Sequence, residues 1–286
     1  MSESRGLTLV LGATGKTGSR VAGKLADEGA EVRTAARNGA DVRFDWDDVA
    51  THRPALRGVR AVYLMAPVLR TDFAPQVSAF LDLAEAEGVG HVTFLSAYGT
   101  EAAPPEVALR AVELDLLGRL GLTHSIVRPA WFMQNFSETF LRPIDGAIVV
   151  PTEDGREAFV DADDIAAVVA ATLAEPDAHA GAEYAPTGPE SITMAEAARV
   201  IGEVVGVPIR HVSPDRDAWL AGVIVTGVPE AYGQVLEMLT KTVAVGNGAR
   251  PNGDVEAVTG VAPRSFAEFA ARTASAWTAE AVGSDA

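Results

Sequence analysis

A glycine-rich turn near the N-terminus limits what this chain of 286 residues can fold into more than any other feature. The apolar run LTLVL (7–11) leads through this turn into the amphipathic segment 18–29, so that Gly12, Gly15 and Gly18 lie between a strand and a helix. In such turns the glycines permit the tight bend, the approach of a pyrophosphate and the packing of the helix, whose N-terminus faces the phosphates. The alternative is a tight turn without a ligand. The residues predicted to bind the dinucleotide phosphates are Gly12, Ala13, Thr14, Gly15, Lys16, Thr17 and Gly18.

Over its first two thirds, the chain alternates short β-branched runs with amphipathic stretches. This alternation is typical of strand–helix–strand units and predicts an α/β fold, a Rossmann-type doubly wound parallel sheet. The expected strands span residues 7–11, 31–36, 42–45, 61–66, 91–96 and 124–128.

The alternation stops after Arg128, where an aromatic-rich segment begins. Two later helices begin with capping boxes, in which Thr193 pairs with Glu196 and Ser265 with Glu268. The chain is therefore expected to form an NAD(P)-binding domain and a smaller, mostly helical substrate-capping region. These are assigned to residues 1–130 and 158–186, and to residues 131–157 and 187–286.

Charge and composition exclude several kinds of partner and chemistry. The formal net charge is −16 and no stretch gathers Lys and Arg into a patch, so nucleic acid and anionic membranes are poor partners. The chain has no cysteine, and its five histidines lack ligand spacing, so no metal site is expected. The N-terminal apolar run is too short for a signal sequence or a membrane span. We expect a soluble cytoplasmic protein, either a monomer or a homodimer.

The end of the second predicted strand bears on the choice of cofactor. Where an NAD-binding fold usually offers an acid to the ribose 2′-hydroxyl, this chain carries Arg37, which can bind a 2′-phosphate as a fork. Together with Lys16, Arg37 favours NADPH over NADH; the alternative is that Arg37 is a solvated loop residue. Asp45, at the end of the third strand, is expected either to meet the adenine or to cap the next helix.

Several of these segments together resemble the NmrA-like branch of the atypical short-chain dehydrogenase/reductases. The matching segments, in the family's order, are GATGKTG, FDWDD, YLMAP, FLSAYG, IVRPAWFMQNFSE and AFVDADDIAAV. The RPAWFMQNFSE block is similar to relatives of the ergot-alkaloid (agroclavine/festuclavine) dehydrogenases, and more distantly to NADPH quinone reductases and triphenylmethane reductases.

The resemblance implies a sheet of strand order 3-2-1-4-5-6 and a C-terminal region that closes over the nicotinamide. It also implies that the loops after the fourth, fifth and sixth strands contact the cofactor. The positions are Met65, Ala66 and Pro67, then Ser96, Ala97 and Tyr98, then Pro129 and Ala130. Because the family also contains redox sensors that bind the dinucleotide without catalysis, the fold alone does not decide the function.

The chain lacks the Tyr-x-x-x-Lys pair of the usual dehydrogenases. Four positions after its four tyrosines stand Pro67, Ala102, Gly188 and Leu236, and its three lysines lie elsewhere. The helix expected over residues 105–120 offers Arg110, Glu113 and Asp115. Arg110 falls about where relatives place a lysine or histidine, but it cannot donate a proton at neutral pH; it either binds an anion or lies on the helix surface.

Without a neighbouring lysine, Tyr98 stays a neutral hydrogen-bond donor. Such a donor is poor for an unactivated ketone, whose alkoxide must be protonated, but adequate for acceptors that give a stabilised product. Ser96 and Tyr98 are the predicted catalytic donors; the alternative is that both only pack around the nicotinamide.

Aromatic side chains after the sixth strand predict a flat substrate wall, with plain core packing as the alternative. The residues assigned to this wall are Trp131, Phe132, Asn135, Phe136 and Trp219. The sequence thus predicts an NADPH-dependent reductase of a conjugated small molecule: a quinone, enone, aromatic polyketide ketone or imine of a tailoring pathway in secondary metabolism. The alternative is a non-catalytic NAD(P)-sensing regulator that acts through protein binding.

Overall fold

The structure is a computed structural model that describes residues 6–277, and its chain divides into two compact units. Of the described residues, the first unit holds 6–129, Ala162–Pro186 and Asp254–Val261. The second holds Ala130–Asp161, Thr187–Gly253 and 262–277. The predicted domain boundaries differ from this division mainly at 158–161, which lies in the second unit, and at 254–261, which lies in the first.

A parallel sheet of seven strands forms the centre of the first unit. Its strands in spatial order are β3 (Val42–Arg43), β2 (Val32–Ala36), β1 (Leu7–Leu11), β4 (Val59–Met65), β5 (His91–Leu95), β6 (Thr123–Val127) and β9 (Ala182–Tyr184). The order confirms the predicted doubly wound sheet and adds β9 beside β6. The chain reverses direction across the sheet between β1 and β4, and ligands of such sheets bind at this switch point.

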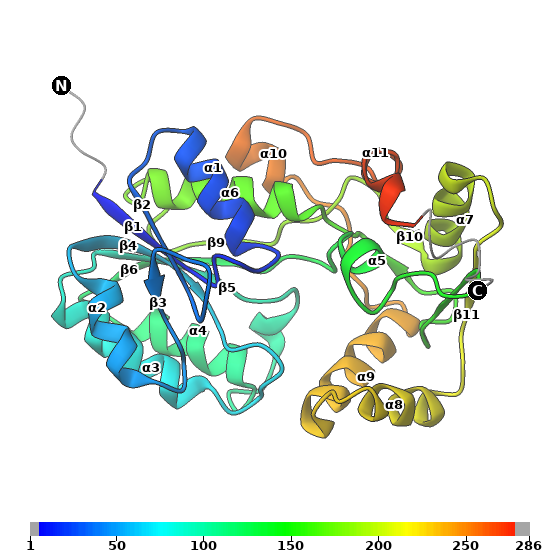
Figure 1. Ribbon diagram of the computed structural model, residues 1–286, viewed down its shortest axis with the longest axis horizontal. Coiled ribbons are helices and arrows are strands. Elements are labelled where there is room, and N and C mark those ends of the chain that lie inside the picture. Colours follow the sequence, from blue (N-terminus) through cyan, green and yellow to red (C-terminus); the bar gives the residue numbers. More distant parts are fainter. Residues whose placement is uncertain (1–5, 278–286) are drawn as a thin grey trace. The chain divides into compact units, whose positions relative to one another are not determined.

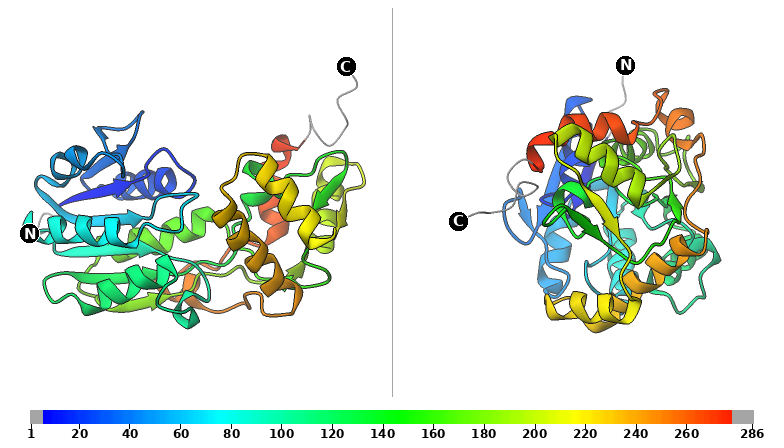
Figure 2. Two further views of the ribbon diagram at one scale, coloured as in Figure 1. Left: turned by 90° about the horizontal axis from the view of Figure 1, so that it is seen from below. Right: turned by 90° about the vertical axis from the view of Figure 1, so that its right-hand side faces the viewer.

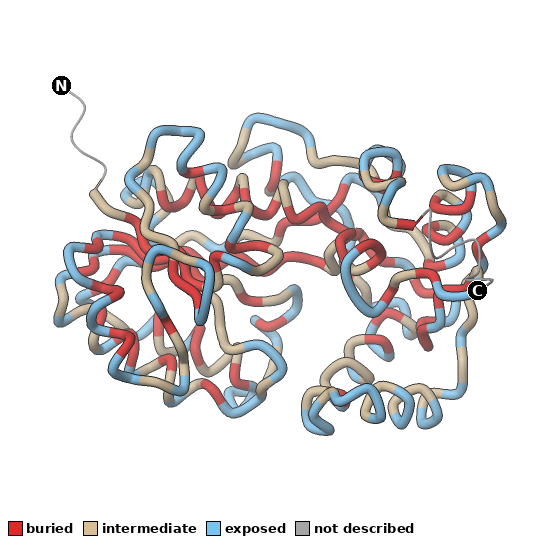
Figure 3. The backbone as a smooth tube through the Cα atoms, in the orientation of Figure 1, coloured by how far each residue is buried: buried red, intermediate tan, exposed pale blue. Residues whose placement is uncertain are grey.

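Helices cover both faces of this sheet (Figure 1). On one face lie α1 (Gly18–Asp27), α6 (Ala162–Ala174) and α10 (Asp254–Thr259), and on the other lie α2 (His52–Leu56), α3 (Ala74–Ala86) and α4 (Ala108–Gly118). Because both faces are covered, the central strands are apolar along most of their length and almost entirely buried (Figure 3). The segment 254–261 belongs to this unit because α10 packs against α6.

The second unit is mostly helical, with two small two-stranded sheets that the sequence did not predict. Its strands are β7 (Ala147–Val149), β8 (Arg156–Glu157), β10 (Ile192–Thr193) and β11 (Arg210–Val212). Strands of two or three residues are too short to show an alternating pattern. Its helices are α5 (Asn135–Glu138), α7 (Met194–Val205), α8 (Arg216–Val225), α9 (Glu230–Ala244) and α11 (Phe266–Thr273).

Aromatic side chains fill the core of the second unit. The rings of Phe136, Phe159 and Phe266 meet at centroid distances of 5.0 to 6.0 Å, and Trp277 donates its indole N–H to the carbonyl of Phe136 at 2.6 Å. Both predicted capping boxes, at the N-termini of α7 and α11, are present. Outside this aromatic core, α8 and α9 lie side by side (Figure 2). No residue of α8 is buried.

Candidate functional site

The glycine turn after β1 favours glycine at two positions. Gly12 has a φ of +63°, and a Cβ added there would lie 2.3 Å from the Cε of Met65. A Cβ on Gly18 would lie 2.2 Å from the carbonyl oxygen of Gly12, so this glycine lets α1 begin directly against the turn. The amide of Gly15 donates to the same Gly12 carbonyl at 2.8 Å and closes the turn.

Backbone N–H groups without protein acceptors lie at the N-terminus of α1. Within residues 6–277, the amides of Thr14, Thr17 and Gly18 donate to no backbone carbonyl. The side chain of Thr17 turns inward instead, where its hydroxyl accepts a hydrogen bond of 2.7 Å from the buried Tyr63. Free amides at a helix N-terminus are the usual ligands of an anion, so the turn can hold a phosphate through its backbone.

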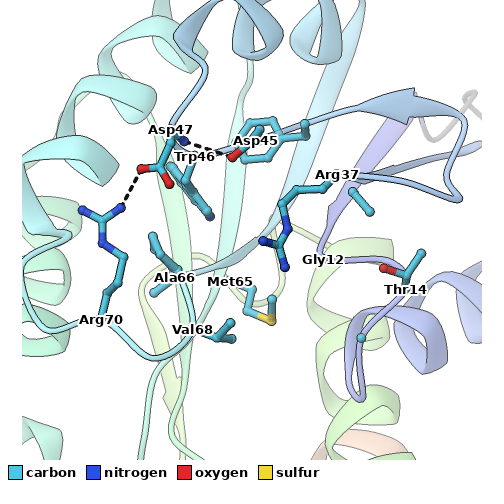
Figure 4. A pocket seen from close by; sticks show the side chains of 14 residues that line it. Gly12, Thr14, Arg37, Asp45, Trp46, Asp47, Met65, Ala66, Val68 and Arg70 are labelled. Atoms are coloured by element: carbon cyan, nitrogen blue, oxygen red, sulfur yellow. Dashed lines mark hydrogen bonds and ion pairs between the residues drawn. The ribbon is translucent and has the colours of Figure 1, made fainter. Parts of the chain in front are cut away.

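A cavity of about 280 Å³ adjoins this turn (Figure 4). Its walls come from the segments that follow β1, β2, β3 and β4. The lining includes Gly12, Thr14, Gly15, Arg37, Asp45, Met65, Ala66 and Pro67, all predicted cofactor residues. It also includes Ala36, at the end of β2, and Phe44, Trp46, Asp47, Val68 and Arg70 in the loops after the same strands, all of which the sequence analysis missed.

Charges around this cavity are paired except at one residue. Asp47 accepts a hydrogen bond of 2.9 Å from Arg70, and Asp45 lies 3.6 Å from Arg43. The guanidinium of Arg37 reaches into the cavity from the end of β2 and has no ion pair or hydrogen bond among the described residues (Figure 4). The cavity therefore offers one uncompensated positive charge.

Asp45 does not cap the next helix. Its carboxylate accepts from the backbone N–H of Asp47 at 3.1 Å, while Asp48 caps the following helical turn through Ala50. Asp45 lines the cavity instead, and its contact with an adenine stays a prediction.

The loop after β5 carries the two predicted donors in different environments. Tyr98 is 37% exposed, and its hydroxyl makes no hydrogen bond to another described residue. Ser96 is buried and donates its hydroxyl proton to Glu113 at 2.6 Å. While Glu113 is ionised, Ser96 has no proton left for a bound molecule, so of the two predicted donors only Tyr98 has a hydroxyl proton that is not committed to a described residue. The backbone of this loop is held in place, because the amide of Ser96 donates to the carbonyl of Val127 and the amide of Tyr98 donates to the carbonyl of Pro129.

Glu113 lies at the centre of a buried ionic network that the sequence analysis did not predict. It is 0% exposed and accepts hydrogen bonds from Arg128 at 2.7 and 3.0 Å and from Arg110 at 2.9 Å. Burial alone would raise the pKa of Glu113, but the hydrogen bonds from Arg128, Ser96 and Arg110 outweigh it and lower that pKa. Glu113 therefore stays ionised at neutral pH. Arg110 is bound to this network, which supports a structural role for it.

The remaining predicted cofactor residues lie around the turn and the two loops. Ala13 is buried and donates its amide to Ala35, whereas Lys16 and Ala97 are half-buried. Pro129 accepts from the Tyr98 amide, and Ala130, with 2% of its surface exposed, begins the second unit.

The predicted substrate wall is only partly at the surface of the second unit. Phe136 is fully buried between Phe159 and Phe266, so it is a core residue and does not fit the role of a wall. Trp131 is half-buried and meets the exposed ring of Phe140 edge to face at 6.0 Å. Trp219 is also half-buried and donates its indole N–H to Val149.

The other two wall residues are half-buried. Phe132 pairs through its backbone with Val160, and the side chain of Asn135 accepts from Thr139 at 3.1 Å. Gln134 is buried and donates its amide to Asp161. Trp131, Phe132, Asn135 and Trp219 therefore remain candidates.

Residues 6–277 contain neither a membrane span nor a metal-binding cluster. No helix there has the length and apolar character needed to cross a membrane. No group of three or more His, Cys, Asp or Glu side chains in the same range is arranged to hold a metal ion.

Known proteins resemble this chain over nearly its whole length. The oxidoreductase YesF of Bacillus subtilis (strain 168), described as uncharacterised, is 35% identical over 280 residues, covering 94% of this chain and 96% of that protein. Agroclavine dehydrogenase of Claviceps fusiformis is 30% identical over 286 residues, covering 94% and 98% of the two chains.

Solved structures share the fold. An NADPH-dependent quinone oxidoreductase from Escherichia coli, complexed with NADPH, has a TM-score of 0.77 at 20% identity and covers 93% of this chain and 99% of that chain. The model of the NmrA-like family matches residues 4–277. With its doubly wound sheet and glycine turn, the chain belongs to the NmrA-like family.

Proposed function

We propose that the protein is an NADPH-dependent oxidoreductase that transfers a hydride to a conjugated small molecule, such as a quinone, an enone, an aromatic polyketide ketone or an imine. The observation that carries this proposal is the cradle of the first unit, in which free helix amides adjoin a cavity with the unpaired cation Arg37. The names of the oxidoreductase relatives support the reaction class.

The described residues fit the parts of a dinucleotide. The amides of Thr14, Thr17 and Gly18 would bind the pyrophosphate, since they donate to no backbone carbonyl among the described residues and lie at the N-terminus of α1. Arg37 would bind a 2′-phosphate, because a guanidinium without a carboxylate partner offers a charge-assisted fork. The acids of the cavity, Asp45 and Asp47, lie beside arginines and repel such a phosphate less than free carboxylates would.

The bound cofactor supplies the hydride, and the protein supplies binding and orientation. Tyr98, exposed and without a described hydrogen-bond partner, would donate a hydrogen bond to the accepting oxygen or nitrogen. As a neutral donor without a lysine four positions on, it suits acceptors whose product anion is delocalised, or whose product is a neutral amine. The half-buried aromatic rings Trp131 and Trp219 suit a planar ligand, and tailoring of secondary metabolites is a use that fits this substrate class.

Turnover tests the proposal directly. Purified protein should oxidise NADPH in proportion to the amount of a quinone such as menadione, or of a cyclic enone or iminium salt. Tyr98→Phe should lower kcat roughly tenfold or more while leaving the Kd for NADPH unchanged, since one proton-donating group is lost. Tight NADPH binding without turnover of any acceptor would contradict the proposal and indicate the sensor.

Substitution of Arg37 tests the cofactor preference. Arg37→Ala should weaken NADPH binding about 10- to 100-fold and NADH binding by less than about threefold, because only NADPH carries the phosphate that the guanidinium pairs with. Titration calorimetry measures both. Arg57→Ala is the matched control, because it removes the same charge from a residue that does not line the cavity. Equal losses for the two cofactors would show that Arg37 does not bind the 2′-phosphate.

A further inference from the structure

Side chains from three segments of the first unit meet at Glu113, one of them from the loop that carries Tyr98. Ser96 comes from the loop after β5, Arg110 and Glu113 from α4, and Arg128 from the end of β6. The remaining guanidinium nitrogen of Arg128, Nη1, donates to Glu183 of β9 at 2.6 Å. Glu113 thus receives four hydrogen bonds of 2.6 to 3.0 Å and has no exposed surface.

These contacts fix both loops at the carboxyl ends of β5 and β6. Glu113 holds the loop after β5 through the Ser96 hydroxyl, and it holds the end of β6 through the bidentate pair with Arg128. The two loops are also joined through their backbones, because the amide of Tyr98 donates to Pro129 at 3.0 Å. Movement of Glu113 would therefore release Ser96 and Arg128 together. In the sequence, Ser96 lies two residues before Tyr98 and Arg128 lies directly before Pro129, so both are close to the ends of the Tyr98–Pro129 backbone hydrogen bond.

We propose that Glu113 is the positioning residue for Tyr98. This role rests on the proposed reductase function. It explains how Tyr98 is held in position although the residue four positions later is alanine and not lysine. Glu113 does not touch the reacting atoms; it orients the loop after β5 through Ser96 and Arg128. Bidentate arginine–carboxylate pairs fix geometry as well as charge, which an apolar cluster of the same volume would not do.

A double-mutant cycle separates positioning from general stabilisation. Glu113→Gln keeps the shape of the side chain but removes its charge, and it should lower kcat for a quinone about tenfold with the Kd for NADPH unchanged. In the Tyr98→Phe background the same substitution should change kcat by less than about twofold, because no hydroxyl remains to be positioned. An equal loss of kcat in both backgrounds would overturn the proposal, since a merely structural role acts whether or not the hydroxyl is present.

Amide hydrogen exchange gives a readout that does not depend on turnover. Glu113→Gln should speed exchange at the amides of Ser96 and Tyr98 about tenfold or more, while the amides of β1 keep their rates relative to global unfolding. Asp115→Asn is the matched control: Asp115 lies on the same helix and accepts two hydrogen bonds from Arg119, at 3.2 and 3.0 Å, but it contacts neither loop. Unchanged exchange at Tyr98, or the same acceleration in Asp115→Asn, would refute the role of Glu113.

Ser96→Ala serves if Glu113→Gln does not fold. It removes one hydrogen bond and leaves the pair of Glu113 with Arg128 intact. It should therefore also speed amide exchange at the loop after β5, but by a smaller factor than Glu113→Gln. The outcomes also separate the two proposals. If wild type turns over no acceptor but exchange at Tyr98 is faster in Glu113→Gln, only the reductase function is contradicted. If wild type turns over a quinone but the losses of kcat in Glu113→Gln and Tyr98→Phe add up in the double variant, only the positioning role is contradicted.

Discussion

The two ends of the sheet in the first unit contain buried polar clusters of opposite character. At the carboxyl ends of β5 and β6, Glu113 and Arg128 are ionised and pair at 2.7 and 3.0 Å. At the amino ends of the same strands, burial lowers the pKa of His91 to about 4, which keeps its ring neutral. Its nitrogens lie 2.9 Å from the hydroxyl of Thr123 and 3.3 Å from that of Thr93.

The difference shows which end of the sheet is organised for a ligand. In open parallel sheets ligands bind outside the carboxyl ends of the strands, and here that end carries the glycine turn, the cavity and the Tyr98 loop. The amino end joins strands and α6 through neutral hydrogen bonds, as between Thr93 and Thr172. Substitutions at the carboxyl end should therefore change cofactor binding or turnover, some of them together with stability, and substitutions at the amino end should change stability only.

The largest expected effect comes from breaking the buried ion pair. Arg128→Met leaves the carboxylate of Glu113 buried with Arg110 as its nearest remaining cation, and it should lower the free energy of unfolding by about 3–5 kcal/mol. Urea denaturation followed by circular dichroism measures this loss.

Removal of both charges is the control. Glu113→Leu combined with Arg128→Met should recover at least half of the lost stability, because no unpaired carboxylate is left in the interior. A double variant as unstable as Arg128→Met would mean that lost packing, and not the uncompensated charge, is responsible.

A smaller effect is expected at the glycine turn. Gly18→Ala forces a Cβ toward the Gly12 carbonyl and should lower stability by about 1–3 kcal/mol and NADPH affinity by about tenfold or more. Gly23→Ala on the same helix meets nothing within 4 Å and should stabilise the protein by about 0.5–1 kcal/mol without changing NADPH affinity. Thermal unfolding and cofactor titration test both, and similar outcomes for the two glycines would contradict the close approach at Gly18.

The smallest effect is expected at the amino end, through pH. The pKa of His91 is lowered on folding, so its contribution to stability is lost as the pH falls from about 6.5 toward about 4. Between pH 7 and pH 5.5 wild type should lose about 1 kcal/mol relative to His91→Asn, with equal NADPH affinity in both proteins at pH 7. Urea denaturation at the two pH values measures the difference.

The pH dependence of wild type must be compared with that of His91→Asn, because Glu157 changes the stability in the opposite direction as the pH falls. Burial raises the pKa of Glu157 in the second unit to about 7, so protonation of this carboxyl stabilises the folded chain as the pH falls. The Glu157 contribution is the same in wild type and in His91→Asn and cancels in the difference. An identical pH dependence of wild type and variant would show that His91 is not held neutral by burial.

Local sequence predicted the strands, the capping boxes and the glycine turn because neighbouring residues determine them. The spacing of Gly12, Gly15 and Gly18 after an apolar run is compatible with few backbone conformations. The predicted turn is present, and it leaves no room for a Cβ at Gly18. The short strands of the second unit could not be predicted, since two residues such as Arg156 and Glu157 show no period.

The site was less predictable because contacts between distant residues decide it. Phe136 and Trp131 belong to one aromatic segment, yet packing against Phe159 and Phe266 buries Phe136 completely and leaves Trp131 partly exposed. Nothing near Ser96 in the sequence indicates that its proton is donated to Glu113, 17 residues away.

The sequence by itself determined the class of fold, the glycine turn after the first strand and the absence of a lysine four positions after Tyr98, since these depend on residue identity and spacing. Only the tertiary structure decided which polar groups are free to act. Arg37 remains unpaired among the described residues because the acids near it lie beside other arginines, and Ser96 is committed because Glu113 lies beneath it. A hydrogen bond or ion pair needs both partners within about 3–4 Å, and such distances follow from the packing of the chain.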